Sequence, residues 1–260
     1  SETDRLKDFG YKTNKTGFTL GTQFEYYDDF YFGVGINSYY ESIETDSTAS
    51  SQQKKLKGNY FDNFINLNFD YDKRNQKFQP SQGFRNYFST DLPIVSETNT
   101  LANTFITTNY FEYFDSNILK SSFYFRNSNS ITGDNIKLSE RLYLPSNRLR
   151  GFESGKVGPK DGNDFIGGNY IASLNFSSNV PKILENSQTT DIIIFFDVAN
   201  VWGVDYDSAL DTSDDIKSAI GLGLDWFSPI GPMNFTLSQH LSKGSNDVTE
   251  SFRFNLGTTF

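Results

Sequence analysis

The feature that most constrains this chain is an alternation of apolar and polar residues that recurs along its whole length. It is clearest near the end, where Phe252, Phe254 and Leu256 fall on one face and Arg253 and Asn255 on the other. This period of two is that of a β-strand, because successive side chains of a strand point to opposite faces of the sheet. The pattern predicts about eleven strands, near residues 16–27, 30–43, 58–72, 83–92, 102–113, 118–128, 168–180, 190–202, 219–226, 233–238 and 251–260.

The expected strands are about ten residues long, which is the length that a tilted strand needs to cross a lipid bilayer. Strands of soluble sandwiches are usually shorter, with about five or six residues. Two of the expected strands are less regular, since Phe64 and Phe105 fall on the face that is otherwise polar. The lengths favour an all-β chain that spans a membrane as an antiparallel up-and-down β-barrel.

The composition agrees with a membrane barrel and excludes a helical membrane protein. Mean hydropathy is −0.52, and no segment approaches the run of about 20 apolar residues that a membrane-spanning helix requires. The chain has 26 Phe and 15 Tyr, and aromatic rings of membrane proteins gather where the membrane meets water. We expect this anchoring role for the tyrosines near strand ends, which are Tyr26, Tyr27, Tyr39, Tyr40, Tyr110 and Tyr113.

Charge and the scarce residue types exclude several classes of function. The net charge of −9 argues against nucleic-acid binding, which requires clustered Lys and Arg. The sequence has no Cys to form disulfides, thiolate metal sites or a Cys nucleophile, and His240 is its only His. The acidic stretch 205–215 lacks the Gly and the final Glu of an EF-hand calcium loop. We therefore expect no enzyme activity, no cofactor and no metal site.

The connections between the expected strands alternate between short and long ones. Short connections occur at 28–29, 115–117 and 228–232, whereas long polar ones occur at 44–57, 129–167, 202–215 and 241–250. This alternation is typical of membrane barrels, which have tight turns on one side and long loops on the other. The stretch 72–82 is long where a short turn is expected. Since such barrels close with an even number of strands, we expect further strands on the N-terminal side of this chain.

The loop 129–167 carries the strongest candidate for a functional motif. It contains Arg150, Gly151 and Phe152, followed by several more glycines, and loops of this length are usually functional or disordered. If the loop folds back into a barrel, the Arg150 guanidinium needs a carboxylate partner. Asp197 is the candidate, because it is a lone carboxylate in an apolar strand and would be costly to bury unpaired.

Taken together, several motifs resemble the BamA branch of the outer-membrane assembly-factor superfamily, and the resemblance covers nearly the whole chain. The motifs occur in the family's order: Arg150-Gly151-Phe152, Gly167-Gly168-Asn169, Asp197 to Trp202, Ser228 to Pro232, and a C-terminal strand that ends in Phe260. The entry segment Gly10 to Phe18 and the turn Asp72 to Gly83 are also similar to the family's, which accounts for the length of that turn.

The resemblance implies a specific architecture. The family has a barrel of sixteen strands preceded by periplasmic POTRA repeats, so residues 1–260 would be the C-terminal portion with the last eleven strands. The long loop would be the one that tucks into the lumen, where Arg150 of the Arg-Gly-Phe motif packs against Asp197. The family's last strand pairs weakly with its first and opens as a lateral seam; in this chain that strand carries Phe252, Phe254, Leu256, Gly257 and Phe260.

The resemblance also implies the function and the location. Such a protein is integral to the Gram-negative outer membrane, where it folds and inserts client outer-membrane proteins by templating their strands at the seam. Its partners would be unfolded outer-membrane proteins, assembly-complex lipoproteins and the lipid bilayer, with no nucleic acid. Two alternatives remain open: a two-partner-secretion-type polypeptide transporter of the same superfamily, and a passive porin, for which an Arg-Gly-Phe motif is not expected. A soluble β-sandwich binding module is the more remote alternative.

Overall fold

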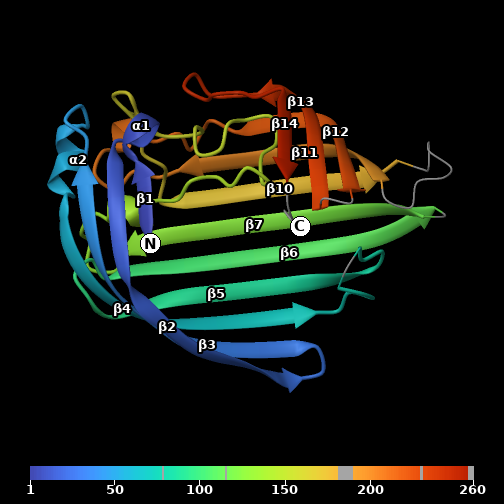
Figure 1. Cartoon of the computed structure of the whole chain (residues 1–260), viewed down its shortest axis with the longest axis horizontal. Coiled ribbons are helices and arrows are strands. Elements are labelled where there is room, and N and C mark those ends of the chain that lie inside the picture. Colours follow the sequence, from blue (N-terminus) through green and yellow to red (C-terminus); the bar gives the residue numbers. More distant parts are fainter. Residues whose placement is uncertain (78, 115, 181–189, 229–230, 257–260) are drawn as a thin grey trace.

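The computed structural model describes the chain except for residues 78, 115, 181–189, 229–230 and 257–260. Its main element is one twelve-stranded sheet in which every neighbouring pair is antiparallel (Figure 1). From edge to edge the strands are β1 (Glu2–Arg5), β2 (Tyr11–Tyr27), β3 (Phe30–Thr45), β4 (Gly58–Asp72), β5 (Gly83–Ser96), β6 (Thr100–Phe114), β7 (Asn117–Ser130), β10 (Tyr170–Asn179), β11 (Thr190–Trp202), β12 (Lys217–Ser228), β13 (Gly231–Ser242) and β14 (Phe252–Leu256).

The remaining elements are short and lie in the connections. They are α1 (Leu6–Phe9), α2 (Ser51–Lys55), the 3-10 turns η1 (Leu138–Glu140) and η2 (Ser208–Leu210), and a separate ribbon of β8 (Lys160–Asp161) and β9 (Asp164–Phe165). Within the described ranges, no helix is long and apolar enough to cross a membrane.

All eleven predicted strands are present, so the prediction of an antiparallel up-and-down all-β fold is confirmed. The twelfth strand, β1, was not predicted and is only four residues long; it pairs with the start of β2. The sheet curls about a hollow side (Figure 1), and its order runs from β1 to β14 without a pairing between these two edge strands in the described part of the chain. We call the hollow side the lumen.

The predicted alternation of connections fails at one place. β5 continues to Ser96, beyond the predicted end at residue 92, so that only residues 97–99 connect it to β6 on the side of the long loops. Pro93 lies within this extension, and the pairing of β4 with β5 shifts register beside it, between Asn63 and Phe64. A bulge accommodates a proline in a strand, because proline has no N–H to donate to the ladder.

The unusually long turn between β4 and β5 is held together by its own side chains. The Arg74 guanidinium donates two hydrogen bonds of 2.7 Å to the Asp72 carboxylate, and Asn75 donates one of 2.9 Å to Ser81. Gly83 ends the turn with a φ of +97°, where a Cβ would stand 2.1 Å from the Lys73 carbonyl oxygen. Only glycine fits there, because of both the backbone angle and the lack of space.

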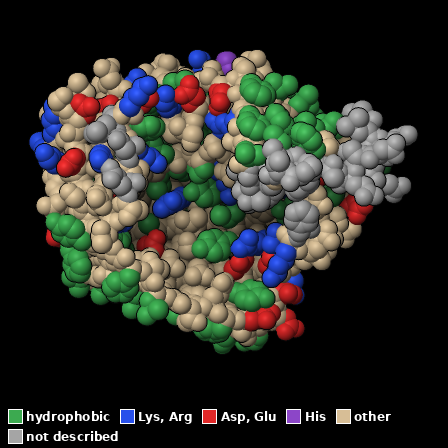
Figure 2. Space-filling model, viewed as in Figure 1, with side chains coloured by type: hydrophobic (Ala, Val, Ile, Leu, Met, Phe, Trp, Pro, Cys, Tyr) green, Lys and Arg blue, Asp and Glu red, His purple; other side chains and the backbone are tan. Residues whose placement is uncertain are grey.

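The two faces of the sheet follow the alternation in the sequence. On β12, Ile220 and Leu222 are exposed on the outer face, whereas Lys217 and Ala219 are buried on the lumen face. The outer face continues in the same way across the sheet, with exposed apolar side chains at Phe18, Leu20, Val34, Ile36, Phe105, Leu174, Phe176, Ile194, Phe196, Leu237, Phe252, Phe254 and Leu256. Figure 2 looks into the hollow side, where Lys and Arg side chains lie in the depression. Apolar outside and polar inside is the arrangement of a barrel in a bilayer.

Three sequence predictions about aromatic residues are wrong. Tyr110 was predicted to anchor the membrane interface, yet it lies on the lumen face of β6, in alternation with Ile106, and Lys120 Nζ lies 5.8 Å from its ring. Phe105 was predicted on the polar face, yet it is exposed on the apolar outer face, where its ring lies 6.2 Å from that of Phe123. Tyr39 was predicted to anchor the membrane interface, yet it points into the lumen and stacks on the buried ring of Phe64 at 6.0 Å. Both strands mix apolar residues on the two faces, so the pattern alone assigns the faces poorly.

The apolar core lies between the sheet and the long connection from β7 to β10, which folds into the lumen. This connection, residues 131–169, is called the loop below. The core contains loop residues Leu142, Leu144, Leu149, Phe152 and Val157, packed with strand residues Tyr124, Ile171, Ala199, Val201 and Ala219. The loop therefore supplies about half of the core, and its position determines how the lumen face is packed.

Replacing Leu222 with Arg should strongly reduce folding into membranes. Leu222 lies in the middle of β12 and is 51% exposed on the outer face. An arginine facing lipid near the bilayer centre costs about 2–4 kcal/mol. The measurement is the fraction of protein that runs as the compact, heat-modifiable form after folding into phospholipid vesicles.

Ile131→Arg is the matched control. Ile131 is 62% exposed but lies just beyond the end of β7, where an arginine near the membrane surface costs about 0–1 kcal/mol. Equal loss of the compact form in both variants would contradict the assignment of the outer face to lipid.

Candidate functional site

The structure brings together the two charged residues that the sequence singled out. The Arg150 guanidinium donates from Nε to Asp197 Oδ2 and from Nη2 to Asp197 Oδ1, both at 2.7 Å. The Arg150 backbone N–H donates to Oδ2 as well, at 3.0 Å. The guanidinium carbon also lies 3.6 Å from the centre of the Phe195 ring. The loop is thus attached to β11 by a bidentate ion pair and by a cation–π contact.

Asp197 is fully buried on the lumen face of β11, and its neighbours satisfy both carboxylate oxygens. Asn175 stands opposite Asp197 in the register of β10 with β11, and its amide donates to Asp197 Oδ1 at 2.8 Å. The same amide donates to the backbone carbonyl of Arg148 at 2.8 Å. A buried carboxylate is tolerated only when it is paired and hydrogen-bonded in this way.

Gly151 and Phe152 carry the loop from this ion pair toward the C-terminal strands. Gly151 has a φ of +90°, and a Cβ there would lie 3.2 Å from the Cβ of Ala219 and 3.3 Å from that of Ser238. The backbone therefore approaches β12 and β13 closely. Phe152 follows as a fully buried core residue, and its carbonyl accepts a 2.7 Å hydrogen bond from Arg253 of β14.

Arg253 was not predicted as a site residue, although it connects the motif to the C-terminal strand. Besides Phe152, it bonds the carboxylate of Glu250 at 2.6 Å and the carbonyl of Ser146 at 3.3 Å. The Glu250 backbone N–H in turn donates to the Gly151 carbonyl at 3.0 Å. The strand alternation places Arg253 on the lumen face, which is a signal that would have identified it.

The predicted seam residues lie on the outer face of β14 as far as the structure describes them. Phe252, Phe254 and Leu256 are exposed there, and β14 pairs with β13 over five residues, from Phe252 to Leu256. Gly257 and Phe260 lie outside the described residues, so what the sequence predicts about them stays a prediction.

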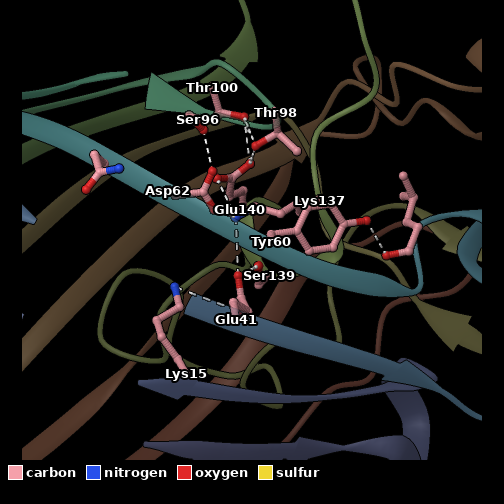
Figure 3. A network of polar contacts seen from close by, with 12 residues as sticks. Lys15, Glu41, Tyr60, Asp62, Ser96, Thr98, Thr100, Lys137, Ser139 and Glu140 are labelled. Carbon is pink, nitrogen blue, oxygen red and sulfur yellow. Dashed lines mark hydrogen bonds and ion pairs between the residues drawn. The ribbon is translucent and has the colours of Figure 1, made fainter. Parts of the chain in front are cut away.

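A second charged contact attaches the first part of the loop to the opposite half of the sheet, and sequence reasoning missed it. Lys137 is fully buried and its ammonium group contacts Asp62 of β4 and Glu41 of β3, the latter at 3.3 Å (Figure 3). Ser139 also donates to Glu41, at 2.9 Å. Glu41 shares β3 with Glu44, and Asp62 shares β4 with Asp70 and Asp72, so neither stands out from the sequence as a lone carboxylate.

An acidic residue of the connection between β11 and β12 contacts the loop as well, and another stabilises the connection itself. The Asp205 carboxylate contacts the Arg141 guanidinium and accepts a 2.8 Å hydrogen bond from the Ile136 backbone N–H. Asp211 accepts one of 2.7 Å from the Gly203 backbone N–H. No cluster of three or more His, Cys, Asp or Glu side chains in the described ranges is arranged to hold a metal ion. These carboxylates therefore act in hydrogen bonds within and between the connections.

Comparison with known proteins identifies the family. The chain matches the Omp85 superfamily domain over residues 2–260. It is 23% identical over 256 residues to the outer membrane protein assembly factor BamA of Neorickettsia risticii, which covers 96% of this chain and 34% of that protein. It is 30% identical over 139 residues to BamA of Neisseria meningitidis serogroup B, which covers 43% of this chain and 17% of the relative. The chain thus spans about a third or less of the length of these relatives.

Solved structures show the same fold. BamA from Haemophilus ducreyi lacking POTRA domains 1–3 superposes with a TM-score of 0.84 at 19% identity, over 94% of this chain and 54% of that one. CdiB from Acinetobacter baumannii superposes with a TM-score of 0.60 at 11% identity, over 95% of this chain and 42% of that one. The family match over nearly the whole chain, together with these likenesses, shows that the chain belongs to the Omp85 superfamily of integral β-barrel proteins of the Gram-negative outer membrane.

Proposed function

We propose that this chain is the C-terminal portion of the barrel of an assembly factor that folds client β-barrel proteins into the outer membrane by templating their strands along β14. The observation that carries the proposal is the contact between the loop motif and β14, in which Arg253 holds the Phe152 carbonyl. One relative that matches nearly the whole chain, and another that matches part of it, are named outer membrane protein assembly factors. No covalent chemistry is required.

The physical mechanism is strand addition. β14 pairs with β13 on one side, and on its other side no strand is paired with it in the described part of the chain. The free N–H and C=O groups of such an edge offer main-chain hydrogen bonds to an incoming strand. Pairing at this edge also lowers the cost of moving a client's backbone into lipid, where each unpaired polar group costs several kcal/mol.

The loop supports this edge from the lumen. Arg150 fixes the loop to β11, and two residues later Phe152 is bonded to β14. The loop thereby holds β14 in place relative to a strand three positions away in the sheet. We propose unfolded outer-membrane proteins as the clients, with assembly lipoproteins as further partners and the bilayer as the medium.

Replacing Arg150 with Ala should impair both the barrel and client assembly. The change leaves Asp197 buried without its counter-charge, and breaking a buried pair in this way costs about 3–5 kcal/mol. We expect less of the heat-modifiable, compact form and a lower yield of folded client barrels, measured in vesicles or in cells that depend on the variant.

Arg148→Ala is the matched control in the same loop. The Arg148 guanidinium donates only to the Ser122 hydroxyl, at 3.1 Å, and lies over the Tyr124 ring. Its removal leaves no carboxylate unpaired, so client assembly should remain close to that of the wild type. Normal barrel mobility and normal client folding in Arg150→Ala would refute the role given to the ion pair.

Templating at β14 can be tested by crosslinking, because the chain has no Cys of its own. A cysteine at Phe254, which is 45% exposed on β14, should form a disulfide with a cysteine in the terminal strand of a stalled client. Leu222→Cys on β12 is the control, since its exposure is similar but β12 is paired on both sides.

The crosslinking result also separates the two functions considered within the superfamily. A polypeptide transporter would give no adduct at position 254, and its lumen would conduct ions until an exported polypeptide occupied it. Equal adducts at positions 254 and 222 would indicate non-specific contact and would count against templating.

A further inference from the structure

The pocket around Lys137 holds more negative than positive charge. We use the name Lys137 pocket for Glu41, Asp62, Lys137 and Glu140, which meet where the first part of the loop rests on β3 and β4 (Figure 3). Three carboxyl groups face the single ammonium group, and Glu140 Oε1 lies 3.3 Å from it. Outside the pocket, Lys15 of β2 supplies a further positive charge, 3.8 Å from Glu41 Oε1, and is partly exposed.

Ser and Thr hydroxyl groups donate to each of the three carboxyl groups, but they bring no positive charge and do not reach every oxygen. Oε1 of Glu41 and Oε1 of Glu140 are both buried and accept no hydrogen bond. Three ionised carboxylates against two ammonium groups would leave an excess negative charge in a place of low dielectric constant, which is strongly unfavourable. Retaining one proton among the three carboxyl groups balances the charge.

Glu140 is the group best placed to keep that proton. Burial raises its pKa, and the nearby Lys137 ammonium only partly counteracts the effect. Its Oε2 accepts a 2.6 Å hydrogen bond from the Thr100 hydroxyl, which also lowers the pKa but does not outweigh the effect of burial. The charged and titratable groups around it are Lys15 of β2, Tyr39 and Glu41 of β3, Tyr60 and Asp62 of β4, and Lys137 of the loop, with Glu97 near Tyr60.

We propose that Lys137 is a second positioning residue of the loop, and that ionisation of Glu140 releases this part of the loop from β3 and β4. The Lys137 pocket would hold the beginning of the loop on the N-terminal half of the sheet, as Arg150 holds its middle on β11. Only the expected effect on clients rests on the proposed function. Docking of the loop on β3 and β4 can be measured separately.

The sign of the pH dependence follows from linkage. A carboxyl group whose pKa is raised in the docked state favours docking at low pH, where it is neutral in both states. That contribution is lost as the pH rises through the raised pKa. The contact of Arg150 with Asp197 has no such excess of carboxyl groups, so it should hold the middle of the loop while the Lys137 pocket opens.

Spin-label distances measure the two parts of the loop separately in the full protein. One label pair, Asn135→Cys with Ser47→Cys, reports the distance from the beginning of the loop to the connection between β3 and β4. A second pair, Asn147→Cys with Ser245→Cys, reports the distance from the middle of the loop to the connection between β13 and β14. All four positions are exposed, and the absence of native Cys makes labelling specific within this chain.

In a pH series, the first pair should give a narrow distance distribution at the acidic end and a broad one at the alkaline end, whereas the second pair should stay narrow at both. Glu140→Gln keeps the shape of the side chain without an ionisable group, so it should keep the first pair narrow throughout. Lys137→Met should broaden the first pair at both pH values.

Three results would overturn the proposal: an unchanged first pair in the wild type, a pH response that persists in Glu140→Gln, or a narrow first pair in Lys137→Met. If Lys137→Met does not fold, the comparison of the wild type with Glu140→Gln decides the matter. Client assembly is assayed in parallel. Undocking without a change in assembly would leave the Lys137 contact established and remove only its link to the proposed function.

Discussion

The pairing of Arg150 with Asp197 decides where the loop lies, and the packing of the lumen depends on that position. A sheet with an apolar outer face must place its polar side chains inward. Once the loop covers these side chains, they lose contact with water and need hydrogen-bond partners within the protein. Asp197 receives the guanidinium, a backbone N–H and the Asn175 amide. With these contacts in place, Leu149 before the motif and Phe152 within it are buried in the core.

This arrangement explains how a chain with a mean hydropathy of −0.52 is suited to a membrane. Apolar side chains occupy only the outer face of each strand, so the average over the sequence stays polar. The dry interior is created by the loop, which packs its own apolar residues against inward-facing ones such as Ile171 and Ala219. The loop therefore takes the place that a second layer of structure has in a soluble domain.

The sequence allowed the strands and one of the two charged contacts to be predicted, and the reasons for the failures are specific. Alternation identifies a strand when each face is uniform, as on β12, but it misplaces Phe105 and Tyr39, whose strands mix apolar residues on both faces. The extension of β5 past Pro93 depends on a bulge opposite Asn63, which is a tertiary feature. Asp197 was identified as a lone carboxylate in an apolar strand. Glu41 instead shares a partly polar strand with Glu44, and its partner Lys137 lies 96 residues away.

The two charged contacts of the loop differ in a way that has consequences for its dynamics. At Arg150, one guanidinium meets one carboxylate, and both oxygens of that carboxylate accept hydrogen bonds, so the contact is balanced in charge. In the Lys137 pocket, one ammonium group meets three carboxyl groups, two of which keep an oxygen without a hydrogen bond. The balanced contact lies on β11, two residues before the hydrogen bond of Phe152 with β14, where the proposed function needs a fixed support. The unbalanced one lies on the opposite half of the sheet, where the loop can detach without disturbing that support.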